Sequence, residues 1–349
     1  ILGSEEQYFY RNKMEFSFSN ARWLTQYEIS SEENFGNKDA LGFHIPGMWS
    51  KILDLKECFL QEEPSNEIRL AVRDYAIKNG LDFYDVRNQE GFLRTLMLRQ
   101  NSKGEWMVLF QLYREEKENR ENLFNFVLEK FPQVKTLVYA INPKGNDSIY
   151  DLDIQNYYGE GFLMEEMDGL QFKIGPKSFF QTNYKQALEL YRKTIEFAEI
   201  SENDVVYDLY TGTGTIAQYI AKKAKYVIGI ESVQEAIDAA IEHAKLNGLE
   251  NCEFHCGDMK DVFTEEFLAN HPKADVLITD PPRDGMHQKV VEQILKLSPP
   301  KIVYVSCNSA TQARDLALMK EHYNVVKILP VDMFPQTHHV ENIALLVKK

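Results

Sequence analysis

The sequence has 349 residues, of which 44% are hydrophobic, so it is long enough for two domains that each bury a core. The formal net charge is -14 and neither half of the chain is basic, which argues against a protein that binds nucleic acid over a large part of its surface. No apolar run is long enough for a membrane helix and no secretory signal opens the sequence, so we expect a cytoplasmic protein.

The first half, residues 1–175, predicts a smaller α+β domain. Runs typical of strands lie at 8–18, 92–99 and 106–113, and a turn-prone stretch joins the last two into a hairpin. Helical patterns cover 66–79 and 120–130.

The second half, residues 176–349, predicts a doubly wound, Rossmann-like α/β domain. Apolar strands alternate with helical segments, and two further strands would close a mostly parallel sheet. Ligands of such sheets bind at the carboxyl ends of the strands, so the residues at those ends are candidates for a site. The predicted strands are 205–210, 226–231, 252–256, 275–280, 302–307, 324–329 and 342–348.

The sequence Thr-Gly-Thr-Gly-Thr at 211–215 follows the first of these strands and precedes a helix. Gly212 and Gly214 allow a ligand close to the backbone, and Glu231 ends the next strand, where a carboxylate can bind ribose hydroxyls. This pattern favours an adenosine-containing cofactor. In the alternative, the glycines only shape a turn and Glu231 is a solvated strand end. Asp258 is a candidate for the adenine edge, or a helix cap.

Asp280 ends the fourth strand in the sequence Asp-Pro-Pro-Arg-Asp-Gly, where two prolines hold the aspartate in a rigid turn. This arrangement is typical of methyltransferases that act on planar nitrogen or carbon, and an NAD-dependent dehydrogenase has no evident use for it. Enzymes that methylate exocyclic amines usually have an aromatic residue where Arg283 stands, which disfavours that acceptor.

Cys307 ends the fifth strand beside the expected cofactor site, so it is a candidate nucleophile, although a strand cysteine is more often a small buried hydrophobe. Glu341 directly precedes the last strand, and a closing hairpin would return it to the same edge of the sheet. It is a candidate base, with His338 and His339 as competitors. The four cysteines lack paired ligand spacing, so we expect reduced thiols and no bound metal.

Five motifs in this order resemble the RNA uracil-5 methyltransferases that act on transfer and ribosomal RNA. They are SFFQTN (178–183), DLYTGTGT (208–215), DPPRDG (280–285), SCNSAT (306–311) and HHVEN (338–342), and YRNKMEFSF (10–18) extends the likeness toward the start of the chain.

The resemblance implies an S-adenosylmethionine-dependent enzyme that methylates carbon 5 of a uridine through a covalent cysteine adduct. Cys307 would be the nucleophile, Glu341 the proton acceptor, and Asp280 would lie between cofactor and base. Phe179 would stack on the extruded uracil. The cofactor contacts would be Gln181, Tyr210, Gly212, Thr215, Glu231, Asp258 and Asp280.

Departures from the family pattern remove no reacting group. The family commonly has Cys-Gly-Met-Gly-Asn where this chain has 211–215, and many members begin with an RNA-gripping β-barrel and three cysteines of an iron–sulfur cluster. Cys58 resembles the fourth cluster ligand but cannot hold a cluster alone, so we expect none in this chain. The first residue is Ile, so we expect the sequence to be a trimmed form or a fragment of a longer protein. We also expect a monomer that acts on RNA and does not bind a membrane.

Two alternatives stay open beside this interpretation. One is a methyltransferase for another RNA base or an exocyclic amine, with Cys307 structural. The other is an RNA-binding or scaffold protein that kept a degenerate cofactor fold.

Overall fold

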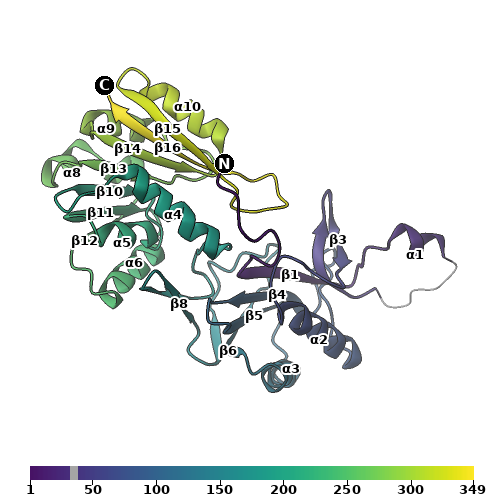
Figure 1. Ribbon diagram of the computed structural model, residues 1–349. Helices are drawn as coiled ribbons and strands as arrows, with labels where there is room; N and C mark the ends of the chain where they lie inside the picture. Colours follow the sequence, from purple (N-terminus) through teal and green to yellow (C-terminus); the bar gives the residue numbers. More distant parts are fainter. Residues whose placement is uncertain (32–37) are drawn as a thin grey trace. The chain divides into compact units, whose positions relative to one another are not determined.

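The computed structural model describes residues 1–31 and 38–349 (Figure 1). The chain forms two compact units, which are described separately. We call Tyr8–Glu165 with Ile174–Lys177 the N-terminal unit, and Ile1–Gln7 with Glu166–Lys173 and Ser178–Lys349 the C-terminal unit. Within the described ranges, no helix has the length and hydrophobicity needed to cross a membrane.

The N-terminal unit is built on a mixed sheet whose described strands have the order β3-β2-β1-β4-β5-β6-β7. All its neighbours pair antiparallel except β5 and β6. The strands are β1 Lys13–Ser19, β2 Ala40–Ile45, β3 Met48–Asp54, β4 Leu93–Gln100, β5 Trp106–Leu112, β6 Val134–Ile141 and β7 Gln155–Tyr158, and the helices are α1 Gln26–Ser30, α2 Ser65–Lys78 and α3 Lys117–Lys130.

Helices α2 and α3 bury apolar side chains against this sheet, including Ile68 and Val72 of α2 and Phe124 of α3. The α+β class is therefore confirmed. The predicted strand at 8–18 is wrong over its first five residues, because β1 begins at Lys13. Phe9 has a φ of 58°, a left-handed conformation that an extended strand cannot include.

The C-terminal unit contains a second sheet, whose described strands have the order β12-β11-β10-β13-β14-β16-β15. β10 to β14 are parallel, and β16 pairs antiparallel with β14 and β15. The strands are β10 Val205–Leu209, β11 Tyr226–Glu231, β12 Cys252–Cys256, β13 Val276–Thr279, β14 Lys301–Ser306, β15 Tyr323–Val331 and β16 Glu341–Lys348. β8 Leu163–Met167 and β9 Leu170–Ile174 form a separate pair.

Helices cover both faces of the second sheet, as the predicted doubly wound class requires (Figure 1). Alternate strand residues on one face, such as Tyr207 and Tyr304, pack with buried side chains of α7, α9 and α10. The other face contacts α4, α5 and α6. The helices are α4 Tyr184–Ala198, α5 Thr215–Ala221, α6 Gln234–Leu246, α7 Met259–Val262, α8 Glu265–Asn270, α9 Gln288–Leu297 and α10 Ser309–Met319.

Candidate functional site

The strand register of the C-terminal unit brings the predicted site loops to one edge of its sheet. Leu209 pairs with both Ile230 and Thr279, so β10, β11 and β13 end at the same level. β16 runs antiparallel to β14, and Ser306 pairs with Asn342, so the start of β16 lies at this edge too. The loops that follow β10, β11, β13 and β14 are therefore neighbours.

The turn after β10 is a tight backbone structure tied to the end of β11. Gly212 and Gly214 have φ values of 57° and 75°. The Gly212 N–H donates to Oε2 of Glu231 at 3.1 Å, and Oε1 of Glu231 accepts from the N–H groups of Ser232 and Val233. The carboxylate is thus fixed beside the turn, which is the arrangement expected for a ribose-binding group.

Asp208, which we did not single out from the sequence, is hydrogen-bonded to the first residue of this turn. Its side chain is buried and accepts a hydrogen bond of 2.5 Å from Oγ1 of Thr211. Burial raises the pKa of Asp208 to about 7. An aspartate inside an otherwise apolar strand was the signal that could have revealed it.

The remaining candidate cofactor contacts lie around the same turn. Thr215 is buried at the first position of α5, and Asp258 is the N-cap of α7, where its side chain accepts from the N–H of Lys260. Burial raises the pKa of Tyr210 to about 12, and the negative charge of Asp258 raises it further. Gln181 is half-buried in the segment before α4.

Substitution of the two glycines of the turn by alanine should lower the free energy of unfolding by different amounts. At Gly212 an added Cβ meets no atom within 4 Å, so Gly212→Ala should cost only the strain of a positive φ, about 1 to 2 kcal/mol. At Gly214 the Cβ would lie 2.9 Å from Cβ of Ala240, which adds about 1 to 3 kcal/mol of overpacking. Urea unfolding of both variants measures this difference, and equal losses would contradict it.

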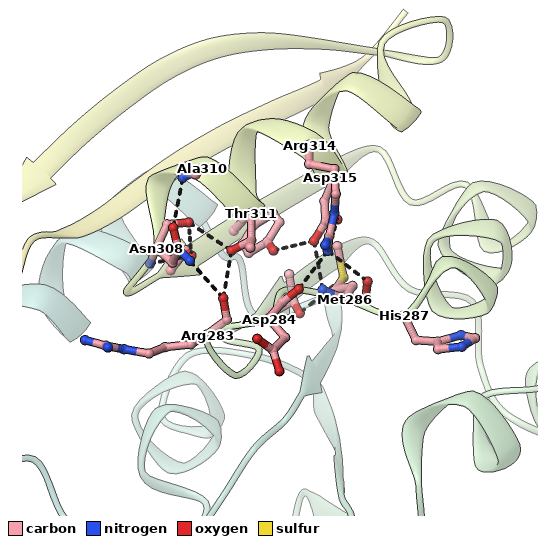
Figure 2. Close-up of polar contacts among 12 residues, drawn as sticks. Arg283, Asp284, Met286, His287, Asn308, Ala310, Thr311, Arg314 and Asp315 are labelled. Carbon is pink, nitrogen blue, oxygen red and sulfur yellow. Dashed lines mark hydrogen bonds and ion pairs between the residues drawn. The ribbon is translucent and has the colours of Figure 1, made fainter.

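The loop after β13 is hydrogen-bonded to the loop after β14 and to helix α10, as Figure 2 shows. The backbone oxygen of Arg283 accepts from Nδ2 of Asn308 at 3.1 Å and from Oγ1 of Thr311 at 3.0 Å. Nearby, Oδ2 of Asp315 accepts from the N–H of Met286 and from the hydroxyl of Tyr304, both at 2.8 Å. These bonds hold the segment that carries Asp280 against the segment that carries Cys307.

Cys307 and Glu341 lie at adjoining strand ends, one residue beyond the paired Ser306 and Asn342. Gln312 of α10 bridges the two strands, because its Nε2 donates to the backbone oxygens of Tyr304 and Asn342. Glu341 is 7% exposed, and burial raises its pKa to about 7. A carboxyl group with this pKa can accept a proton near neutral pH.

The charges around Cys307 act in opposite directions. Burial raises the pKa of the thiol, and the negative charges of Glu341 and Asp280 raise it further. The guanidinium of Arg283 opposes them through a hydrogen bond and its positive charge. Asp280 is half-buried, and burial together with Glu341 and Asp208 raises its own pKa. The charges of Glu341, Asp280 and Arg283 thus all act on the thiol of Cys307.

The histidines that competed with Glu341 have different surroundings. His338 is exposed, and Nδ1 of His339 lies 2.6 Å from NH2 of Arg283, where it accepts a hydrogen bond. His339 therefore contacts the guanidinium rather than competing for a proton in this arrangement. The sequence distinguishes Arg283 only as a departure from amine methyltransferases and does not predict its proximity to Cys307.

Phe179 lies on the surface and is 68% exposed, in the segment that leads into α4. This segment is anchored through Asn183, the N-cap of α4, whose Nδ2 donates to the backbone oxygen of Met333 at 3.0 Å. Met333 belongs to the connection between β15 and β16, which continues to Glu341. The segment that carries Phe179 and Gln181 is thereby attached to the one that carries the candidate base.

Comparison with known proteins identifies the family of the chain. Residues 152–349 match the family model for tRNA (uracil-5-)-methyltransferases. An uncharacterized RNA methyltransferase of Porphyromonas gingivalis is 53% identical over 100% of this chain and 76% of its own length, and one of Bacteroides thetaiotaomicron is 51% identical over 99% and 77%.

Among solved structures, the tRNA (uracil-54, C5)-methyltransferase of Pyrococcus abyssi, in complex with S-adenosyl-L-homocysteine, is similar to the whole chain. Its TM-score is 0.79 at 30% sequence identity, and the match covers 99% of this chain and 78% of that protein.

Proposed function

Because the chain belongs to the tRNA (uracil-5-)-methyltransferase family, we propose that it transfers a methyl group from S-adenosylmethionine to carbon 5 of a uridine in transfer or ribosomal RNA. Cys307 is the transient nucleophile in this proposal. The observation that supports it most directly is the placement of Cys307 and Glu341 at adjoining strand ends, with Asp280 and Arg283 close to the thiol.

The residues around the glycine turn fit an adenosyl cofactor. The space beyond Gly212 is open, and Glu231 is held beside it with its carboxylate at the carboxyl end of β11. In this proposal Glu231 binds the ribose hydroxyls, and Asp258 binds the adenine edge. The remaining contacts come from Gln181, Tyr210, Gly212, Thr215 and Asp280. When bound, S-adenosylmethionine supplies an electrophilic methyl group on a sulfonium.

The protein must activate carbon 5 of the uracil, which is a weak nucleophile. The thiolate of Cys307 adds to carbon 6, and the electron pair released from the carbon 5–carbon 6 double bond makes carbon 5 enolate-like. After carbon 5 has taken the methyl group, Glu341 removes the proton from that carbon. The thiolate then leaves, and the ring double bond returns.

The environment of each reacting group suits its task. With a pKa of about 7, Glu341 is partly ionised near neutral pH and can accept the carbon 5 proton. Asp280 lies between the glycine turn and Cys307 along the sheet edge, where it can hold the uracil against the cofactor. Arg283 favours the thiolate of Cys307 that begins the reaction.

Removal of the Arg283 charge should make Cys307 a weaker acid. In Arg283→Gln, we expect the pH at which the thiol becomes reactive to rise, because the neighbouring carboxyl groups are then unopposed. Arg283→Lys keeps the charge and should shift the profile less. The measurement is the rate of iodoacetamide labelling of Cys307 against pH, followed by peptide mass spectrometry. An unchanged profile in Arg283→Gln would contradict the role of Arg283.

The RNA must present its uridine outside the helix stack, because base-modifying enzymes act on extruded bases. The exposed ring of Phe179 is available to stack on such a base. We propose that residues 1–175 contact the RNA around the target and that residues 176–349 perform the methyl transfer.

The proposed reaction is tested by incubating the protein with deuteriomethyl S-adenosylmethionine and RNA from cells that lack it. Nucleoside mass spectrometry should then find the label in 5-methyluridine, and separate tRNA and rRNA fractions distinguish the substrates. Label in another nucleoside would contradict methylation at carbon 5 of uridine.

A further inference from the structure

Three potential metal ligands converge at the edge strand of the second sheet, outside the site described above. Glu253 and His255 are two positions apart in β12, so their side chains project from the same face of the strand. His271 directly follows α8. Oε1 of Glu253 lies 3.1 Å from Nε2 of His255 and 3.7 Å from Nε2 of His271. All three ligand atoms lie within 4.8 Å of one another.

These separations match the needs of a small divalent ion. Zinc binds nitrogen and oxygen ligands at about 2.0–2.2 Å, so ligand atoms of a tetrahedral site are roughly 3.4 Å apart. The separations from Glu253 to the two histidines are close to this value, and the two histidine nitrogens lie within 4.8 Å of each other, so small rotamer adjustments would place the three ligand atoms on one face of a tetrahedron. Two imidazole nitrogens in the ligand set favour zinc over calcium and magnesium, which prefer oxygen ligands.

The ligand atoms are oriented by partners on their far sides, as is usual in metal sites. The hydroxyl of Tyr226 donates to Oε2 of Glu253 at 2.8 Å, which leaves Oε1 directed to the histidines. Nδ1 of His271 lies 2.7 Å from the backbone oxygen of Phe267, which fixes the tautomer whose Nε2 carries a lone pair. The ring of His271 also stacks on that of Phe267, with centroids 4.0 Å apart.

A buried polar atom points to a missing partner at the same place. Nε2 of His255 is buried, and its 3.1 Å contact with Oε1 of Glu253 does not have the geometry of a good hydrogen bond. Its ring is held edge-on by those of Phe267 and His271. A buried nitrogen that is poorly hydrogen-bonded is costly, and an ion between the three side chains would remove that cost.

We propose that Glu253, His255 and His271 bind a divalent transition-metal ion, with Zn²⁺ as the favoured ion. The site is structural: it fastens His271, at the end of the α7–α8 segment, to the strand that precedes that segment. It is separate from the glycine turn, because Glu253 and His255 project from one face of β12 and Phe254 projects from the other. On that other face the ring of Phe254 lies against the turn, since a Cβ on Gly214 would be 3.2 Å from it.

The test uses the metal-free protein and Co²⁺ as a spectroscopic probe. We expect Co²⁺ to give the visible d–d absorption of a four-coordinate nitrogen and oxygen site, at one ion per chain, and Zn²⁺ to displace it. Both Glu253→Gln and His271→Ala should weaken binding by about 100-fold or more, since loss of outer-shell partners alone costs about 10- to 100-fold. His322→Ala, at an exposed histidine elsewhere in the unit, is the matched control and should bind as the original protein does.

Three results would overturn the proposal. The first is absence of the d–d bands, and the second is bands of equal strength in the ligand variants and the original protein. The third is a sulfur-to-cobalt charge-transfer band, because it would assign the ion to Cys252 or Cys256 instead. Tyr226→Phe keeps all three ligands, so it should keep the d–d bands but bind Co²⁺ with lower affinity. This variant shows whether the bands are lost through removal of a ligand or through disturbance of the fold. None of these readouts depends on methyl transfer.

Discussion

Cys307→Ala is expected to lower the rate of uridine methylation by at least about 1000-fold, since the variant cannot form the covalent bond that activates carbon 5. The fold should survive, because Cys307 is only half-buried and its loop is held by hydrogen bonds of Arg283, Asn308 and Thr311. Single-turnover assays with RNA measure the rate, and RNA containing 5-fluorouridine should form a stable adduct with the original protein but not with the variant.

Cys252→Ala is the matched control for this experiment. Cys252 lies at the start of β12, the end of the strand away from the site loops, and burial raises the pKa of its thiol to about 12. Its removal should leave both the rate and the adduct unchanged. Full activity of Cys307→Ala would rule out the covalent mechanism and favour a methyltransferase with a different acceptor.

Glu341→Gln is expected to slow turnover by about 100- to 10,000-fold, the usual worth of a general base. Because the proton on carbon 5 is removed after methyl transfer, the variant should still add the thiolate and transfer the methyl group. The enzyme should then stay bound to the methylated RNA, because elimination of the thiolate requires proton loss. Denaturing gels with labelled RNA would reveal this covalent species.

Glutamine resembles the neutral form of Glu341. The variant therefore loses the proton acceptor without losing the stability that the neutral side chain gives to the fold. The folded-state pKa of Glu341 is raised from 4.5 to about 7, so its stabilising neutral form is fully present below about pH 4.5 and lost as pH rises through about 7. At pH 8 the variant should therefore unfold at no lower urea concentration than the original protein. A variant that is both inactive and less stable at pH 8, with no trapped RNA, would contradict the assignment. Glu321→Gln, at an exposed carboxylate, is the control.

The sequence by itself determined the fold class and the edge of the sheet where the candidate site lies. The rhythm of apolar strands and helices predicted the parallel sheet, and residues that directly follow such strands reach its carboxyl edge through local geometry alone. For this reason Glu231, Asp280 and Cys307 could be selected before any coordinates were known. Strand boundaries such as the start of β1 were less accessible, because one residue in a left-handed conformation ended the extended run.

Only the tertiary structure decided which groups act on one another. Burial set the pKa of Glu341, and the proximity of Arg283 to both Cys307 and His339 came from packing among three loops. The expectation that the chain binds no metal came from the spacing of its cysteines. The proposed ligands Glu253, His255 and His271 have no such spacing, and their side chains come within 4.8 Å of one another only in the folded protein. Desolvation and electrostatic coupling depend on distances between residues remote in sequence, so no local pattern encodes them.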